Sequence, residues 1–253
     1  MIDATSAGVL LGWGVFTTIG IKDGRALWVD EHLARLRRDA SRCDIELPFS
    51  DDDLRAGLFA VVEANGVRHG LARVTLARRD DGRWNTQAGS DVTILATETA
   101  PGKERDLRLT IRRAPDLRPL TGSKTTSYLP YFAIWQSARD DGWDEALLIS
   151  RLGRVIEAAR SSAFWVRNGI LGTSPLSRGA LDGVGREVVL RQAREWNMRV
   201  REESVSVEQL KSCSELFLVS AATGPRLVSA IGQVPLASQA PVFERFHAWW
   251  HAL

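Results

Sequence analysis

The first hundred residues alternate between the apolar patterns of strands and those of helices. Apolar residues at helical spacing follow Asp30, a suitable N-cap, and predict a helix whose buried face begins at Leu33. A second helix is expected from Ser50 to Asn65. Apolar runs bounded by turn residues predict strands at 15–21, 26–29, 71–76, 92–96 and 107–111. This order is typical of an α+β unit rather than of repeated βαβ units.

A break in regular structure is expected in the middle of the chain. Pro115, Pro119 and Gly122 favour irregular backbone, so we predict an interdomain linker at 112–122, between domains at 1–111 and 123–253. The second domain is expected to be of α/β type. Its apolar patterns predict helices at 131–138, from 185 onwards and at 243–250, and strands at 146–149, 163–166 and 216–219.

Composition and charge exclude several classes of protein. The net charge is +2, and 44% of residues are hydrophobic against 25% charged, which are ordinary globular values. Basic residues number 33 and acidic residues 31, so no strong field favours nucleic acid or an anionic membrane. No apolar run reaches the roughly 18 residues of a membrane span. We therefore expect a cytoplasmic protein whose partners are neither nucleic acids nor membranes.

The chain offers little to a metal ion. Two cysteines, Cys43 and Cys213, lie far apart in the sequence and cannot form a thiolate zinc site by themselves. The four histidines, His32, His69, His247 and His251, show no ligand spacing that suggests a metal centre. We predict no bound metal, so the chemistry must use other groups.

One lysine stands out. Only four of the 33 basic residues are lysines, and Lys124 alone follows the linker and opens a polar stretch, 124–128, ahead of an apolar helix. A lone lysine is most often a solvated surface residue. Further along, Glu157 follows a turn and two branched apolar residues, where an exposed loop acid is an equally good interpretation. Gly183 and Gly185 precede a helix whose first N–H groups could bind an anion, although two glycines at this spacing more often mark a turn.

The order of these segments is more specific than any one of them. It resembles the order in the class IV aminotransferases, the fold type IV pyridoxal-phosphate enzymes that include branched-chain and D-amino-acid aminotransferases and aminodeoxychorismate lyase. The resemblance extends from about residue 14 to about residue 232. The segments that carry it are Gly14-Val15-Phe16-Thr17-Thr18-Ile19, His32-Leu33-Ala34-Arg35-Leu36, Lys124-Thr125-Thr126-Ser127-Tyr128-Leu129, Gly142-Trp143-Asp144-Glu145-Ala146, Gly153-Arg154-Val155-Ile156-Glu157 and Leu181-Asp182-Gly183-Val184-Gly185-Arg186.

The resemblance implies a two-domain α/β fold of the D-amino-acid aminotransferase type, with pyridoxal 5′-phosphate bound between the domains. Lys124 would form the Schiff base with the cofactor and move the substrate proton. Glu157 would pair with the protonated pyridine nitrogen, and Tyr128 would contact the 3-oxygen or pack beside it. Arg35, which lies off the apolar stripe of its helix, would bind the phosphate.

The remaining implied contacts lie at helix and strand ends. Val184 and Gly185 would offer main-chain N–H groups to the phosphate, and Ser220 would add a hydroxyl or cap its own strand. The residues expected to line the substrate site, or else to have structural roles only, are Phe16, Thr18, Arg78 and Ala221.

Several positions depart from the family pattern. Thr17 stands where many transaminases have Glu, which favours the lyase. Against the lyase, the Asn often found near Ser220 is missing, and so is the Asn or His that commonly follows the lysine at Lys124. Gly185 replaces a common Thr, and Ser162 replaces a usual Asn. In addition, Arg79 replaces the Gly that follows the substrate-binding Arg in relatives.

The function favoured by the resemblance is amino transfer from an amino acid to a 2-oxo acid by a ping-pong mechanism, in a homodimer. The alternative is aminodeoxychorismate lyase, which uses the same carbanion chemistry but releases pyruvate and 4-aminobenzoate. A third possibility, suggested by the altered positions, is a protein that binds pyridoxal phosphate without catalysis.

Overall fold

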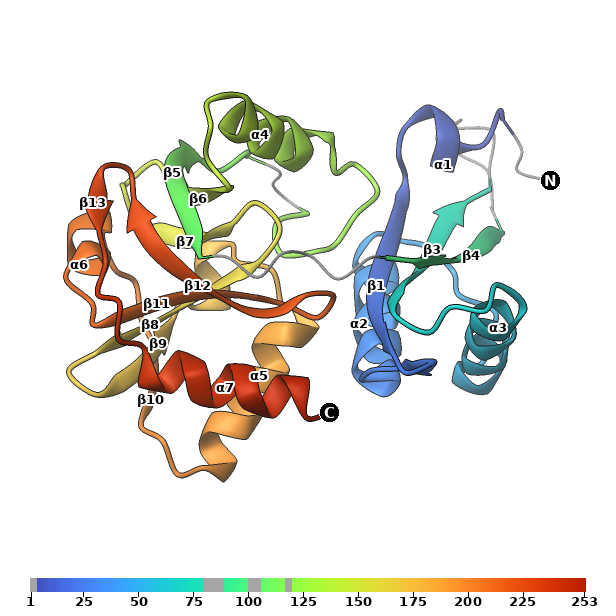
Figure 1. Cartoon of the computed structure of the whole chain (residues 1–253). Helices are drawn as coiled ribbons and strands as arrows, with labels where there is room; N and C mark the ends of the chain where they lie inside the picture. The colour runs from blue at the N-terminus through green and yellow to red at the C-terminus, as the bar shows by residue number, and fades with distance from the viewer. Residues whose placement is uncertain (1–3, 80–88, 100–105, 117–119) are drawn as a thin grey trace. The chain divides into compact units, whose positions relative to one another are not determined.

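A computed structural model describes residues 4–79, 89–99, 106–116 and 120–253. The chain forms two compact units (Figure 1). The first unit is Met1–Gly102 with Ser123–Tyr128, and the second is Lys103–Gly122 with Leu129–Leu253.

The first unit is an antiparallel sheet with helices packed on one face. Its strand order is β2-β1-β3-β4, and helices α2 and α3 lie beside the sheet (Figure 1). Its core contains Val15, Ile19, Val74 and Leu76 from the sheet and apolar residues of both helices. The elements are α1 (Ala7–Leu10), β1 (Gly14–Lys22), β2 (Arg25–Ala26), α2 (Val29–Arg42), α3 (Asp51–Ala64), β3 (Gly70–Arg78) and β4 (Ser90–Glu98).

The starts of the two long helices differ from each other. Helix α3 begins after Ser50, as predicted, with a capping box in which Ser50 and Asp53 bond to each other's backbone N–H. The expectation that Asp30 is the N-cap of α2 is wrong. The helix starts earlier, after Trp28 in a left-handed conformation without a side-chain cap, and Asp30 lies in its first turn. An acid at that place still interacts favourably with the helix dipole.

The second unit is built on a mixed sheet. Its strand order is β10-β9-β8-β11-β12-β5-β6-β7, with β13 paired to β12. Strand β5 pairs in parallel with both β6 and β12, whereas β8 and β11 are antiparallel neighbours. The elements are β5 (Leu107–Arg113), α4 (Leu129–Asp140), β6 (Glu145–Ile149), β7 (Val155–Ala158), β8 (Ser162–Arg167), β9 (Ile170–Thr173), η1 (Leu176–Arg178), α5 (Val184–Glu195), β10 (Val200–Glu202), α6 (Val207–Lys211), β11 (Glu215–Ser220), β12 (Gly224–Ile231), β13 (Val234–Pro235) and α7 (Pro241–His251).

The units divide the chain differently from the expected domains 1–111 and 123–253. Strand β5 belongs to the second unit because its ladder partners, β6 and β12, are there. Residues 123–128 belong to the first unit because they run along β1. Strand β2 pairs only with the last residues of β1, and near the start of β1 Thr125 forms a β-bridge with Val15. Part of the expected linker, 117–119, lies outside the described residues.

Within those same four ranges, none of the helices has the length and apolar character that crossing a membrane requires.

Candidate active-site residues

Lys124 lies on the segment that lines the edge of β1. The Phe16 N–H donates to the Lys124 carbonyl at 2.9 Å, and the Thr126 N–H donates to the Gly14 carbonyl at 2.8 Å. These ladder bonds fix the backbone on both sides of the lysine. The polar segment is thus held along β1 by backbone hydrogen bonds.

The Lys124 amine lies against two aromatic rings. Its Nζ is 4.6 Å from the ring centroid of Phe16 and 4.6 Å from that of Tyr128. The two rings contact each other edge to face, with centroids 5.5 Å apart. Cation–π attraction and partial burial therefore hold the amine near one place. An amine fixed in this way can act as a nucleophile toward a carbonyl or as a base toward a nearby C–H.

Asp39 ties the lysine segment to helix α2. Its Oδ2 accepts a hydrogen bond from the Lys124 N–H at 3.1 Å, and the side chain is buried. Burial raises the pKa of Asp39, while the Lys124 hydrogen bond and the charges of Arg35 and Arg38 oppose that shift. The sequence pattern did not identify Asp39, because a single acid in a helix carries no motif of its own.

A second polar contact on α2 holds Arg35. Its Nη2 donates to the Thr17 hydroxyl at 2.6 Å, and the same hydroxyl lies 2.6 Å from Nδ1 of His32. All three side chains are buried. Burial first, then the charges of Arg35 and Lys124, hold the pKa of His32 well below its usual value. Arg35 does lie off the apolar stripe of α2, as predicted, but it is buried rather than exposed.

Strand pairing decides which side chains share a face with the lysine amine. Phe16 lies opposite Thr75 and Thr18 lies opposite Arg73, so these four side chains point to one face of the sheet. The Arg73 guanidinium stacks 3.7 Å from the Phe16 ring centroid, and its Nε donates to Thr75 at 3.1 Å. Burial lowers the pKa of Arg73 from its usual value. The sequence analysis did not identify Arg73. Alternation along its strand alone does not show whether Arg73 points to the face of Phe16 or to the face that the helices cover.

The structure does not bring Arg78 together with Phe16 and Thr18. Arg78 alternates with Val74 and Leu76, on the face that the helices cover. Its guanidinium stacks 4.4 Å from the Trp13 ring and contacts the Asp44 carboxylate at 3.2 Å. Arg78 therefore supports the packing of the first unit rather than the face with Lys124.

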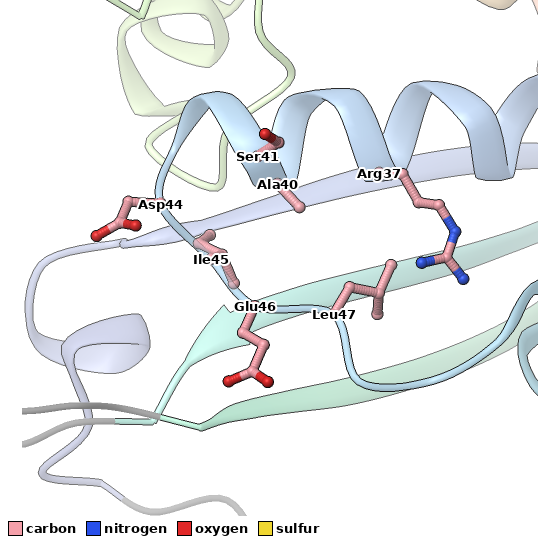
Figure 2. A pocket seen from close by; sticks show the side chains of 7 residues that line it. All are labelled: Arg37, Ala40, Ser41, Asp44, Ile45, Glu46 and Leu47. Carbon is pink, nitrogen blue, oxygen red and sulfur yellow. The ribbon is translucent and has the colours of Figure 1, made fainter.

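A surface pocket lies elsewhere in the first unit. It is formed by the end of α2 and the segment that follows it (Figure 2). Its lining residues are Arg37, Ala40, Ser41, Asp44, Ile45, Glu46 and Leu47. None of these is a predicted site residue, so this pocket carries no argument about the chemistry.

In the second unit, Glu157 is a buried carboxylate on β7. Its Oε2 accepts a hydrogen bond from the Leu181 N–H at 3.1 Å, which links the strand to the loop before α5. Burial, and after it the negative charge of Glu157, raises the pKa of Tyr131 to about 12. A buried carboxylate stays ionised only if positive charges or hydrogen-bond donors lie beside it. A protonated ring nitrogen would be such a partner for Glu157.

The start of helix α5 lies directly against the loop that follows β11. A Cβ atom on Gly185 would be 2.8 Å from the Ala221 nitrogen and 2.9 Å from the Ser220 carbonyl carbon. This close contact leaves no room for a side chain at position 185. No side chain caps the start of α5, because its N-cap residue is Gly183. The N–H groups of the first turn, from Val184 onwards, can therefore donate to another acceptor.

Ser220 itself closes a turn. Its Oγ lies 2.8 Å from the Thr223 hydroxyl and accepts from the Thr223 N–H at 3.1 Å. The strand-capping role that the sequence left open for Ser220 is thus present. Ala221 lies beside Gly185 through its backbone nitrogen.

These groups match the chemistry of pyridoxal phosphate. The first unit supplies an amine between two aromatic rings and a buried guanidinium. The second unit supplies a buried carboxylate and a helix start without a side-chain cap, packed so closely on Ala221 that a side chain at position 185 would not fit. An aldehyde, a phosphate dianion and a protonated pyridine need these kinds of partner.

Comparisons with known proteins find several enzymes that are similar to this chain. D-alanine aminotransferase from Bacillus licheniformis is 29% identical over 246 residues, which are 95% of this chain and 86% of that protein. Branched-chain amino acid aminotransferase from Escherichia coli shares the fold with a TM-score of 0.92 at 24% identity, covering 100% of this chain and 89% of that chain.

A structure from Legionella pneumophila, provisionally assigned as 4-amino-4-deoxychorismate lyase, shares the fold with a TM-score of 0.93 at 21% identity, covering 100% of this chain and 95% of that chain. The sequence model of the family described as amino-transferase class IV matches residues 14–231. Because this match spans most of the sequence, the chain belongs to the class IV aminotransferase family.

Proposed function

We propose that this class IV aminotransferase moves an amino group from an amino acid to a 2-oxo acid in two half-reactions of a ping-pong cycle, with Lys124 as the catalytic residue. The observation that carries the proposal is the position of the Lys124 amine. It lies 4.6 Å from the centroids of both Phe16 and Tyr128, on a backbone that β1 and Asp39 hold in place.

The family depends on pyridoxal phosphate, which when bound supplies an electron sink for the negative charge that develops at the substrate Cα. Lys124 would hold the cofactor through its amine. When that amine is free, it would be the base that takes the proton from the substrate Cα. Because that base is already held near the reacting carbon, proximity replaces a collision in solution.

Several side chains and main-chain groups would hold the cofactor in this proposal. Glu157 would pair with the pyridine nitrogen and favour its protonated form, since a buried carboxylate favours a positive partner. Arg35 would bind the phosphate dianion, as would the first N–H groups of α5 at Val184 and Gly185. Tyr128 packs beside the lysine, and Ser220 shapes the turn that lies next to Gly185.

Arg73 points to a dicarboxylic substrate. Its guanidinium lies on the face that carries Phe16 and Thr18, and Phe16 is the residue whose ring also contacts the Lys124 amine. A partly desolvated guanidinium favours a carboxylate partner. We therefore expect 2-oxoglutarate to be a better amino acceptor than pyruvate.

The lyase reaction is the second candidate, and Thr17 is the residue on which it depends. Thr17 belongs to the Phe-Thr-Thr segment that resembles the lyases. Its hydroxyl, however, is directed to the helix-covered face, where it contacts His32 and Arg35. Thr17 thus lies on the opposite face of the sheet from Phe16 and Thr18, so its resemblance to the lyases does not by itself support the lyase reaction.

Replacement of the lysine tests the catalytic assignment. Lys124→Ala should lose the visible absorption band of the covalently held cofactor and reduce turnover about 1000-fold. Lys211→Ala is the matched control, because Lys211 pairs with Glu208 on α6 and has no part in the site. The measurement is the absorption spectrum and the rate with a panel of L- and D-amino acids and either 2-oxoglutarate or pyruvate. Normal turnover by Lys124→Ala would overturn the mechanism.

The same assay separates the alternatives. Release of 4-aminobenzoate and pyruvate from aminodeoxychorismate, without transfer of an amino group to any acceptor, would replace the transaminase with the lyase. A cofactor absorption band that no amino donor changes would instead indicate binding without catalysis.

A further inference from the structure

Helix α2 buries a stripe of polar side chains. His32, Arg35 and Asp39 lie at positions i, i+3 and i+7 and are 0%, 5% and 1% exposed. Burying polar and charged groups costs free energy that an apolar stripe would not. Buried polar groups that oppose stability are expected where function requires them. Asp39 holds the backbone of Lys124, so the other two members of the stripe need an explanation.

Two short hydrogen bonds meet at the Thr17 oxygen. A guanidinium can only donate, so this oxygen accepts from Arg35. The same oxygen lies 2.6 Å from Nδ1 of His32, and which of the two atoms donates depends on the tautomer of the ring. The proposal takes the tautomer in which Nδ1 accepts from the Thr17 hydroxyl and the proton of the neutral ring lies on Nε2. Nε2 is buried and has no hydrogen-bond partner among the described residues.

We propose that Thr17 and His32 are positioning residues for phosphate binding: neutral His32 orients the Thr17 hydroxyl, which in turn fixes the Arg35 guanidinium for a phosphate monoester. The inference rests on the proposed function, since it takes Arg35 as a ligand of the cofactor phosphate. A guanidinium binds phosphate through a planar fork of donors, so its orientation determines how well it binds. A hydroxyl at position 17 can orient the guanidinium without neutralising its charge.

Comparison of two ligands tests this role. Pyridoxal phosphate and pyridoxal differ only in the phosphate, and the dissociation constant of each is measured by titration of the purified, cofactor-free protein. Thr17→Val removes the hydroxyl and keeps the shape of the side chain. We expect it to weaken binding of pyridoxal phosphate about tenfold, the effect of one hydrogen bond to a charged group. Binding of pyridoxal should change less than twofold. Thr17→Ser, which keeps the hydroxyl, should bind both ligands as the wild type does.

Thr110→Val is the matched control. It removes a buried threonine hydroxyl of β5 that accepts from Arg112 at 2.7 Å, so it also deletes one Arg–Thr hydrogen bond. It should leave both dissociation constants unchanged. In an Arg35→Met background, Thr17→Val should have no further effect on pyridoxal phosphate, because the residue that it positions is gone.

Three results would overturn the inference in distinguishable ways. Equal loss of affinity for both ligands, or no loss, would assign Thr17 a structural role only. Unchanged affinity for pyridoxal phosphate in Arg35→Met would show that Arg35 does not bind the phosphate. Failure of the wild type to bind pyridoxal phosphate would remove the proposed function. Independently of any variant, ¹⁵N NMR of the wild type should find the His32 ring protonated at Nε2 alone, and a proton on Nδ1 would also overturn the proposal.

Discussion

Helices α2 and α3 have equal length and pack in the same unit, but they bury different kinds of side chain. Each spans 14 residues. Helix α3 buries Leu54, Leu58 and Val62 and no charged group, and it begins with a capping box. Helix α2 buries an apolar stripe and a polar one, and it begins after a left-handed tryptophan without a side-chain cap. The helix with the better local signals therefore stabilises the unit, and the helix with the poorer ones carries the candidate site.

The difference follows from what each helix contacts. Helix α2 packs along β1, next to which the segment with Lys124 runs, whereas α3 packs mainly on β3 and β4. Side chains of a helix next to the lysine segment can form hydrogen bonds with the backbone of that segment and with a ligand. The buried face of α3, on the far strands, packs against apolar side chains. Stability and function are thus assigned to neighbouring helices, and variants should affect one without the other.

The largest effect is expected from Leu58→Ala on α3. Leu58 is fully buried in the core, so its truncation should cost about 3 kcal/mol of unfolding free energy. The affinity of the folded protein for pyridoxal phosphate should change less than twofold. Denaturant unfolding and cofactor titration measure the two quantities. Leu36→Ala is the matched variant on the apolar stripe of α2. If Leu58→Ala weakened cofactor binding as much as stability, the division of roles between the helices would be incorrect.

The sequence predicted much of the local structure because the signals are local. The helix from Ser50 to Asn65 is confirmed, since its cap and its stop are encoded within a few residues. The order of the motifs identified the family, and the match over residues 14–231 confirms it. The individual roles of Lys124, Glu157 and Arg35 stay predictions until the variants are made.

What the sequence did not reveal depends on pairing between distant segments. Strand alternation separates Arg73 from Arg78, but only the register with β1 shows that Arg73 shares the face of Phe16. The unit boundary differs from the linker because residues 123–128 pair with β1, which no composition signal could show. Likewise, the burial of His32 and Asp39 requires both the sheet and the lysine segment to be in place.

A smaller effect is expected from pH, through His32 on α2. Burial and the charges of Arg35 and Lys124 hold the pKa of His32 well below 6.5, so the folded protein keeps the ring neutral. The unfolded chain binds a proton as the pH falls below about 6.5, and the folded chain does not. Neutral His32 therefore makes its full contribution to the unfolding free energy above that pH. Below it, this contribution falls by at most about 1.4 kcal/mol per pH unit.

His32→Leu isolates this contribution. The unfolding free energy of the wild type should fall more steeply between pH 6.5 and 5.5 than that of the variant. Asp39, whose pKa is raised by burial, titrates in both proteins and in the opposite sense, so it largely cancels in the comparison. Identical slopes in the wild type and His32→Leu would contradict the buried neutral ring.

The smallest effect is expected at the start of α3. Ser50→Ala deletes the hydroxyl that accepts from the Asp53 N–H at 3.1 Å, so the unfolding free energy should fall by about 1 kcal/mol. Ser50→Thr keeps an acceptor and should lose much less. Neither change should alter the affinity for pyridoxal phosphate, because α3 contributes none of the proposed ligands. If Ser50→Ala did weaken binding of pyridoxal phosphate, a change at the start of α3 would be transmitted to β1. The roles of the two helices would then not be separate.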